Sequence, residues 1–217
     1  SLIGREHYDG VITGFVDVLL PYYADICQKA NLPCYGTRSQ FEIFINKDRY
    51  KALMREYGVP TIPEYEIDPE RFDETAADVS YPVLVKPADS SGARGITICR
   101  SRDELKKAIM TANGFSHTGT VIVEQYIDEQ EVTVFWVFRD GEYYLAAIGN
   151  RHVKHNQEGV IPLPAGYTYP SYVLPRYRRE VEPNVRRMFS AAGIRDGMMF
   201  MQCKVVDGKC LVYDIGY

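Results

Sequence analysis

The sequence predicts an α+β fold whose strands are mostly antiparallel. Two Asp-Gly pairs, Asp140-Gly141 and Asp207-Gly208, each join two strand-like runs, which is the pattern of a tight β-hairpin. Elsewhere, short strand-like runs precede or follow single helix-like segments. These observations favour antiparallel sheets with helices packed against them.

The composition limits the function classes. Of the 217 residues, 46% are hydrophobic and 25% are charged, as in ordinary globular proteins. The net charge of −4 argues against a nucleic-acid partner, and no apolar run reaches the roughly 18 residues of a membrane span. Five cysteines without a C-x-x-C pair are typical of reduced core residues, so we predict a cytoplasmic protein with neither nucleic-acid nor membrane partners.

The first segment has the pattern of a small strand-helix-strand unit. The apolar run at residues 10–14 predicts a buried strand, and residues 17–27 predict a helix with Asp17 as its N-cap. Residues 33–36 then predict a short strand or turn. Such a unit is too small to fold alone, so we interpret residues 1–36 as the tail of an α/β domain.

The remaining elements follow from caps, turns and periodicity. Residues 38–57 predict one or two helices, with Asn46 as the N-cap of the second part and Gly58 as its C-cap. Ser101 opens a capping box for a helix to about residue 112, and residues 150–175 predict a long loop before a helix over 178–192. Strands are expected over residues 64–67, 83–86, 95–99, 121–124, 131–139, 142–149, 198–206 and 209–215.

One strand delivers a lysine to a turn of small residues. Lys86 ends an apolar strand, and residues 88–95 then lead back into the next strand. Small residues let backbone N–H groups approach phosphate oxygens, and Lys86 would add a point charge. The alternative is an ordinary hairpin with a surface lysine.

A second strand ends in a short hinge followed by an acid. Backbone groups of Gln125, Tyr126 and Ile127 can pair with an adenine edge, and Glu131 can accept hydrogen bonds from ribose hydroxyls. The alternative is a sheet edge with solvated acids.

The last hairpin places two oxygen-bearing side chains opposite each other. Gln202 and Asp214 flank the turn at residues 207–208 and can face each other across the strand pair. Oxygen ligands of this kind suit Mg²⁺, which retains waters and shares substrate phosphates. The alternative is a polar pair on a solvated face. His152 and His155 offer a zinc pair at helical spacing, but a polar strand end or loop is the better explanation.

Together, the order and spacing of these motifs resemble the ATP-grasp superfamily, and within it the carbamoyl-phosphate-synthase-like branch, from about residue 37 to residue 217. The resemblance assigns Lys47 and Lys86 as catalytic phosphate contacts and Gln202 and Asp214 as metal ligands. It also assigns nucleotide contacts to Ser90, Ser91, Gly92, Gly95, Glu124, Gln125, Tyr126, Ile127 and Glu131.

The resemblance implies an ATP-grasp fold, in which two lobes with antiparallel sheets sandwich ATP. Residues 1–36 would be a remnant of the preceding α/β domain, residues 37–118 linker helices and the small lobe, and residues 119–217 the large lobe. It implies a ligase that uses ATP and Mg²⁺, with Mn²⁺ as an alternative, to activate a small-molecule carboxylate as an acylphosphate. An amine-type acceptor would attack that acylphosphate, and a homodimer is the expected assembly.

Three departures from the family pattern affect the metal site. Asp214 stands where the family usually has Glu, Gly216 replaces an asparagine ligand, and the family's following arginine would lie after Tyr217. We therefore expect the large lobe to be incomplete at its C-terminal end. Two alternatives stay open: an ATP-binding domain with weakened or lost catalysis, and a non-nucleotide interaction domain in which the motifs arise by chance.

Overall fold

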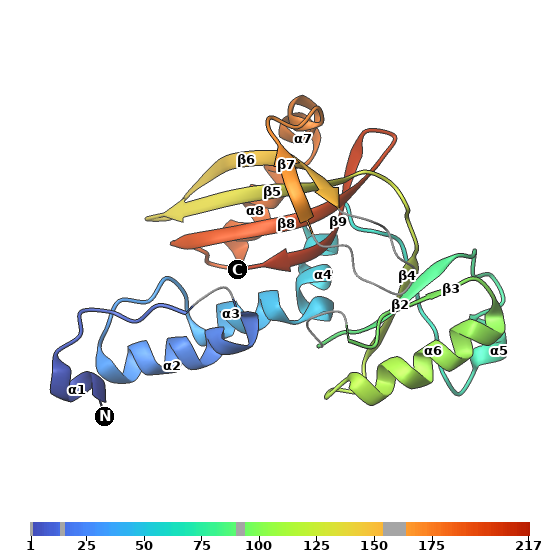
Figure 1. The fold of residues 1–217 in the computed structure, drawn as a ribbon, viewed down its shortest axis with the longest axis horizontal. Helices are drawn as coiled ribbons and strands as arrows, with labels where there is room; N and C mark the ends of the chain where they lie inside the picture. The colour runs from blue at the N-terminus through green and yellow to red at the C-terminus, as the bar shows by residue number, and fades with distance from the viewer. Residues whose placement is uncertain (1, 14–15, 90–93, 154–163) are drawn as a thin grey trace.

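The computed structural model describes residues 2–13, 16–89, 94–153 and 164–217. Two antiparallel sheets form separate lobes (Figure 1). The small lobe has the strand order β1-β4-β2-β3, and the large lobe has the order β7-β6-β5-β8-β9. The predicted α+β class is therefore confirmed. In the described residues, no helix combines the length and apolar character needed to cross a membrane.

The elements have the following bounds. The helices are α1 (Leu2–Glu6), α2 (Leu20–Ala30), α3 (Arg38–Ile45), α4 (Lys47–Glu56), α5 (Phe72–Thr75), α6 (Arg102–Phe115), α7 (Leu174–Glu180) and α8 (Glu182–Ala191), with a 3-10 turn at Asp17–Leu19. The strands are β1 (Glu64–Tyr65), β2 (Val83–Pro87), β3 (Thr97–Cys99), β4 (Val121–Gln125), β5 (Glu131–Arg139), β6 (Glu142–Val153), β7 (Pro164–Thr168), β8 (Gly197–Val206) and β9 (Lys209–Gly216).

Both predicted hairpins form. Asp140 and Gly141 have φ angles of 55° and 85°, and Asp207 and Gly208 have φ angles of 49° and 74°. Two consecutive residues with positive φ define the turn whose twist matches the flanking strands, and Asp-Gly is a favoured pair for it. The second turn pairs Val206 with Lys209, and a β-bulge at Tyr213 then places Gln202 opposite Asp214.

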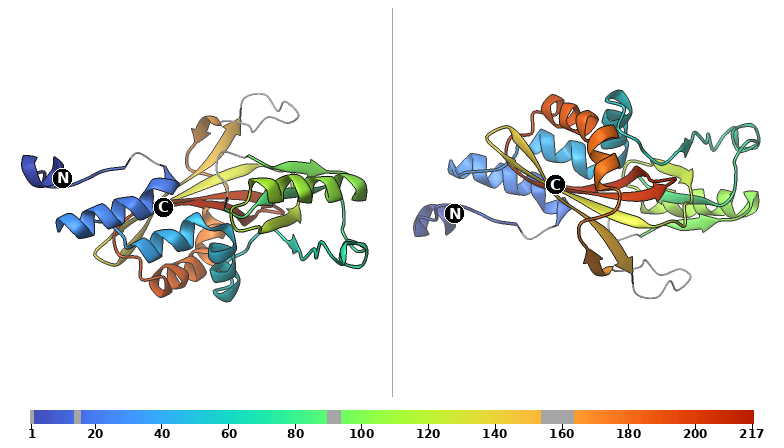
Figure 2. Two further views of the ribbon diagram at one scale, coloured as in Figure 1. Left: turned by 90° about the horizontal axis from the view of Figure 1, so that it is seen from below. Right: turned by 90° about the horizontal axis from the view of Figure 1, so that it is seen from above.

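The large sheet buries one face under helices α4, α7 and α8 (Figure 2). Along β5, Val134, Trp136 and Phe138 alternate into this core, and the Trp136 ring meets Phe189 of α8 edge-on at 5.3 Å between centroids. Glu131 and Thr133, which alternate with the core residues Val132 and Val134, lie on the other face because side chains alternate along a strand. The small lobe has its own core, formed by α6 against β2, β3 and β4.

Helix α4 lies between the lobes and contacts both (Figure 1). Its first amide, Lys47 N–H, donates to Ala88 O of the small lobe at 3.2 Å, and the Tyr50 hydroxyl donates to Asp214 of the large lobe at 3.1 Å. The predicted N-cap is confirmed, because the Asn46 side chain accepts from Arg49 N–H at 3.1 Å. The C-cap is Tyr57, and Gly58, the predicted C-cap, follows it with a φ of 67°.

We expect Asn46→Ala to lower the free energy of unfolding by about 1 kcal/mol, because it leaves a helix N–H group without its acceptor. For a chain of this size that change lowers the melting temperature by about 2–4 °C. Thermal unfolding followed by circular dichroism measures it. Asn46→Asp, which keeps a cap acceptor, should melt close to the wild type; equal melting of the wild type and the alanine variant would contradict the capping role.

The N-terminal predictions are partly wrong. Residues 10–13 form no strand, and residue 14 lies outside the described residues. Ile12 is 94% exposed, and no described strand pairs with this segment, so its backbone lacks the neighbour that a strand requires. Asp17 does not cap the helix: it begins the 3-10 turn, and α2 starts at Leu20. Of residues 33–36, predicted as a short strand or turn, residues 35–36 form a bend and none is a strand.

The predicted loop at 150–175 is also wrong in part. Strand β6 continues to Val153, and β7 pairs with it through Asn150↔Thr168 and Arg151↔Tyr167. The helix expected over 178–192 is instead two helices, α7 and α8, which meet at Val181. Glycine, proline and tyrosine in this segment suggested a loop, but the pairing of β7 with β6 outweighs that local preference.

Candidate active site at the lobe junction

Lys86 reaches from the small lobe to the large lobe. Its side chain is 4% exposed, and its Nζ lies 2.6 Å from Glu124 Oε1 and 3.5 Å from Tyr213 O of β9. Burial lowers the pKa of Lys86, and the neighbouring Lys51 charge lowers it further, although Glu124 opposes both effects. Tyr213 is the extra residue of a β-bulge between β8 and β9, and such bulges are over-represented next to active sites.

Lys47 and the predicted metal ligands meet at the same junction. Lys47 Nζ lies 3.9 Å from Asp214 Oδ1, which also accepts the Tyr50 hydroxyl at 3.1 Å. Gln202 and Asp214 are opposite residues in the β8–β9 register. The structure therefore brings Lys86, Lys47 and the Gln202–Asp214 pair together, although they come from four different elements.

Gln202 and Asp214 suit a cation whose other ligands come from phosphate and water. Gln202 and Asp214 offer an amide oxygen and a carboxylate, both hard oxygen donors. In the part of the chain that the structure describes, no group of three or more His, Cys, Asp or Glu could hold a metal. The pair therefore fits Mg²⁺ only if phosphate oxygens and waters complete its coordination.

Glu124 contacts Lys86 within a buried charge network that the sequence motifs did not predict. It is 3% exposed and accepts from Lys86 through Oε1 and from Lys51 through Oε2, both at 2.6 Å. Lys51 also pairs with Glu64, which pairs with Arg55 at 2.8 Å. Burial raises the pKa of Glu124, but the charges of Lys86 and Lys51 outweigh it and lower the pKa. Lys51 follows Lys47 by four residues on one helix, and that spacing was the available signal.

The predicted adenine hinge is fixed by neighbouring turns. The Gln125 and Tyr126 amides donate to Pro63 O and Pro82 O at 2.9 and 3.0 Å. The Gln125 side chain also donates to Pro82 O, at 3.1 Å. These two amides are therefore used in holding the hinge, and the Glu124 side chain lies with the two lysines.

The predicted ribose acid, Glu131, already has three donors. Lys204 Nζ lies 2.8 Å from its Oε1, while Arg151 and the Tyr213 hydroxyl contact its Oε2, the latter at 3.3 Å. Burial raises the pKa of Glu131, but the hydrogen bond and charge of Lys204, together with Arg151, lower it overall. Lys204 and Arg151 flank Glu131 in the strand register, which the sequence alone does not fix.

The phosphate loop is described only at its ends. Ser90, Ser91 and Gly92 lie outside the described residues. Gly95 has a φ of 74°, and a Cβ there would lie 2.9 Å from Phe115, so the fold itself requires glycine at this position. Asp89 fixes the loop's start, because its carboxylate accepts from Ser116 Oγ and from the His117 and Thr118 amides at 2.7–3.1 Å.

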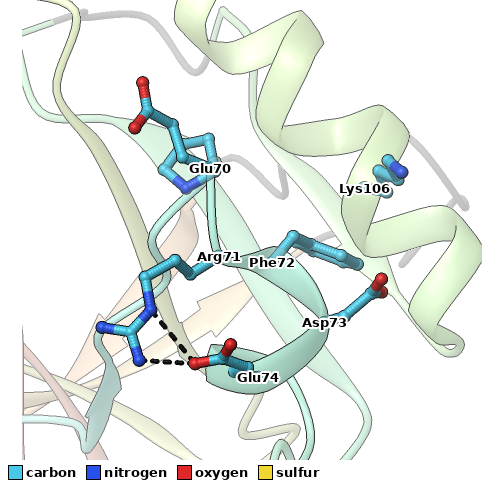
Figure 3. A pocket seen from close by; sticks show the side chains of 7 residues that line it. Glu70, Arg71, Phe72, Asp73, Glu74 and Lys106 are labelled. Carbon is cyan, nitrogen blue, oxygen red and sulfur yellow. Dashed lines mark hydrogen bonds and ion pairs between the residues drawn. The ribbon is translucent and has the colours of Figure 1, made fainter.

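Two other features lie outside this site. His152 shares a 2.6 Å hydrogen bond with Thr168, and His155 lies outside the described residues, so the structure gives no support to the zinc alternative. A surface pocket between α5 and α6 is lined by Phe72, Lys106 and their neighbours (Figure 3). It contains none of the predicted site residues, and Arg71 within it is paired with Glu74.

The fold matches solved ATP-grasp structures over 99% of the chain. A biotin carboxylase–β-γ-ATP complex from Campylobacter jejuni gives a TM-score of 0.83 at 19% identity, with 50% of that chain covered. The biotin carboxylase domain dimer of Hydrogenobacter thermophilus 2-oxoglutarate carboxylase was solved with MgADP, ADP and bicarbonate. It gives a TM-score of 0.82 at 22% sequence identity, with 49% of that chain covered. The fold is therefore the ATP-grasp fold, as the motifs predicted.

The sequence comparisons show the family. Residues 46–168, more than half of the chain, match the carbamoyl-phosphate synthase L chain, ATP binding domain, and the protein belongs to this family. The large chain of Pyrococcus furiosus carbamoyl phosphate synthase is 31% identical over 149 residues, which are 64% of this chain and 14% of that protein. Phosphoribosylamine--glycine ligase of Fusobacterium nucleatum is 26% identical over 188 residues, 82% of this chain and 43% of that protein.

These relatives confirm the predicted membership of the ATP-grasp ligases at the level of the family. The family match over residues 46–168 argues against the alternative in which the motifs arise by chance. The chain spans less than half the length of either relative. The site residues predicted from the motifs, and the division at residues 36 and 118, stay predictions.

Proposed function

We propose that the chain binds ATP with Mg²⁺ at the lobe junction and activates a small-molecule carboxylate for attack by an amine-type nucleophile. The observation that carries this proposal is the convergence of two amines, from different elements, on neighbouring residues of β9. Lys86 approaches Tyr213 O from the small lobe, and Lys47 of α4 approaches the Asp214 carboxylate of the large lobe. An ATP triphosphate is the ligand that needs both cations and an oxygen-ligated metal in one place.

The proposed chemistry requires little covalent help from the protein. A carboxylate oxygen attacks the γ-phosphorus, the bond from that phosphorus to the β–γ bridging oxygen breaks, and ADP leaves. The amine then attacks the acyl carbon of the acylphosphate and displaces inorganic phosphate. Lys86 and Lys47 would neutralise charge on the phosphoryl oxygens, and positioning would supply much of the remaining rate. Mg²⁺ held by Gln202 and Asp214, or Mn²⁺ in its place, would neutralise phosphate charge.

The other end of the nucleotide would lie along the hinge. We assign ribose to Glu131 and adenine to backbone groups at residues 125–127 other than the Gln125 and Tyr126 amides, which hold the hinge. The existing donors of Glu131 keep it ionised, which suits an acceptor of ribose hydroxyls. We also propose the two-lobe division at residue 118 and a homodimer, the assembly named for the Hydrogenobacter thermophilus domain.

The test is nucleotide binding followed by turnover. MgATP should raise the melting temperature of the 217-residue chain, because a ligand that binds only the folded state stabilises it. ATP without a divalent cation should stabilise it less. Phosphate release from ATP should then depend on an added carboxylate and amine, in a screen of amino acids and small carboxylic acids. If MgATP does not change the melting temperature, the proposal is wrong.

A second candidate function is nucleotide binding without turnover. Gly216 stands where the resemblance places an asparagine ligand, and a Cβ there would lie 2.3 Å from the Phe200 ring. A side chain at residue 216 would therefore require the Phe200 ring to move. MgATP binding with no phosphate release for any acceptor would favour this second function.

A further inference from the structure

Lys51 is a fully buried cation to which neither the motifs nor the proposed chemistry gives a role. It is 1% exposed, and it comes from the second turn of α4, one turn after Lys47. Its Nζ contacts Glu64 and lies 2.6 Å from Glu124 Oε2. A buried ammonium is unfavourable unless it is paired, so we infer that the surroundings of Lys51 require a positive charge there.

The strand register explains part of that requirement. Glu64 of β1 and Glu124 of β4 are directly opposite residues in the small sheet. Like charges in opposite positions repel each other, and Lys51 compensates because it contacts both carboxylates. Burial lowers the pKa of Lys51, but Glu124 and Glu64 outweigh burial and raise it, so Lys51 stays charged.

Lys51 also determines how Glu124 meets Lys86. The two Glu124 oxygens are divided, with Oε1 accepting from Lys86 and Oε2 from Lys51. The last torsion of a glutamate side chain is broad, so a carboxylate held on one side only can rotate. With Lys51 present, Glu124 offers a single oxygen to Lys86, which leaves Lys86 donors for a ligand because an ammonium group has three.

We propose that Lys51 is a positioning residue: it holds one oxygen of Glu124 and thereby directs the Lys86 ammonium towards the phosphates of a bound nucleotide. The inference rests on the proposed function, because it requires Lys86 to contact phosphate. If Lys51 only neutralises two carboxylates, its loss should weaken the fold without distinguishing a phosphate-bearing ligand from one that has none.

The test compares two variants that differ only at Lys51. Glu64→Gln keeps the Lys51–Glu124 contact and is the matched control. The double variant K51M/E64Q loses that contact, removes one positive and one negative charge, and leaves Glu124 paired with Lys86. Because the charges stay balanced, the double variant should fold, and thermal unfolding without ligand checks this.

Affinity for MgATP and for adenosine is measured by nuclear magnetic resonance titration of each protein. We expect E64Q to bind both ligands within about threefold of the wild type. K51M/E64Q should lose about tenfold or more in MgATP affinity, the scale of one charge-assisted hydrogen bond, while its adenosine affinity changes less than about threefold.

The other outcomes separate the two proposals. Equal loss of MgATP and adenosine affinity in K51M/E64Q would show that Lys51 is merely structural. Failure of K51M/E64Q to fold while E64Q folds would show the same. A wild-type chain that does not bind MgATP would overturn the proposed function itself, and the inference with it.

Discussion

Lys86→Met should lower the affinity for MgATP by about 100-fold or more while the chain stays folded. The substitution removes a cation from the lobe junction and leaves the Glu124 carboxylate close to the phosphates. Attraction is thereby replaced by repulsion at a site that is 4% exposed, where water screens charges poorly. The fold should tolerate the change because Glu124 keeps Lys51 as its partner at 2.6 Å.

Isothermal titration calorimetry measures this loss, and thermal unfolding without ligand checks the fold. Lys106→Met is the matched control, because it removes the same charge from the exposed side of α6 in the same lobe. It should bind MgATP as the wild type does. Wild-type affinity in the Lys86 variant would remove Lys86 from the phosphate site, and equal losses in both variants would indicate a general effect of net charge.

Local sequence patterns were sufficient for the elements that frame this site. The Asn46 cap, the glycine after α4 and the two Asp-Gly turns depend on residues within a few positions of each other, and the structure has all of them. The predicted N-terminal strand was wrong because a strand depends on a distant partner and not on local residues alone. An apolar run such as residues 10–13 becomes a strand only beside another strand, and none of the described strands lies there.

The partners of the site residues depend on register between distant strands. Lys86 and Lys47 could be placed because they lie near the end of β2 and at the start of α4, and Gln202 and Asp214 because an Asp-Gly turn lies between them. The contacts of Glu124 could not, because they require β1 to place Glu64 opposite it, 60 positions earlier in the chain, and α4 to bring Lys51 between them. The same holds for Glu131, whose partners Arg151 and Lys204 come from β6 and β8.

Glu124→Gln should lower the free energy of unfolding by about 3–5 kcal/mol, the usual effect of removing one partner from a buried ion pair. The substitution leaves two ammonium groups, of Lys51 and Lys86, without the carboxylate that they share, and both are almost fully buried. A glutamine carbonyl can accept from only one of them and carries no charge. Urea unfolding at neutral pH measures the change, and Glu66→Gln, at an exposed position near Glu64, should leave stability within about 0.5 kcal/mol.

The pH dependence of the difference in unfolding free energy between the wild type and Glu124→Gln provides a second, independent test. The pKa of Glu124 is lowered in the folded chain, so its stabilising contribution is fully present above the unfolded value of about 4.3. As pH falls through the lower folded value, Glu124 takes up a proton and that contribution is lost. The gap between the wild type and Glu124→Gln should therefore be constant from about pH 6 to pH 8 and narrow below about pH 4. A gap that stays the same at low pH would mean that Glu124 stabilises the lobe junction by its shape rather than by its charge.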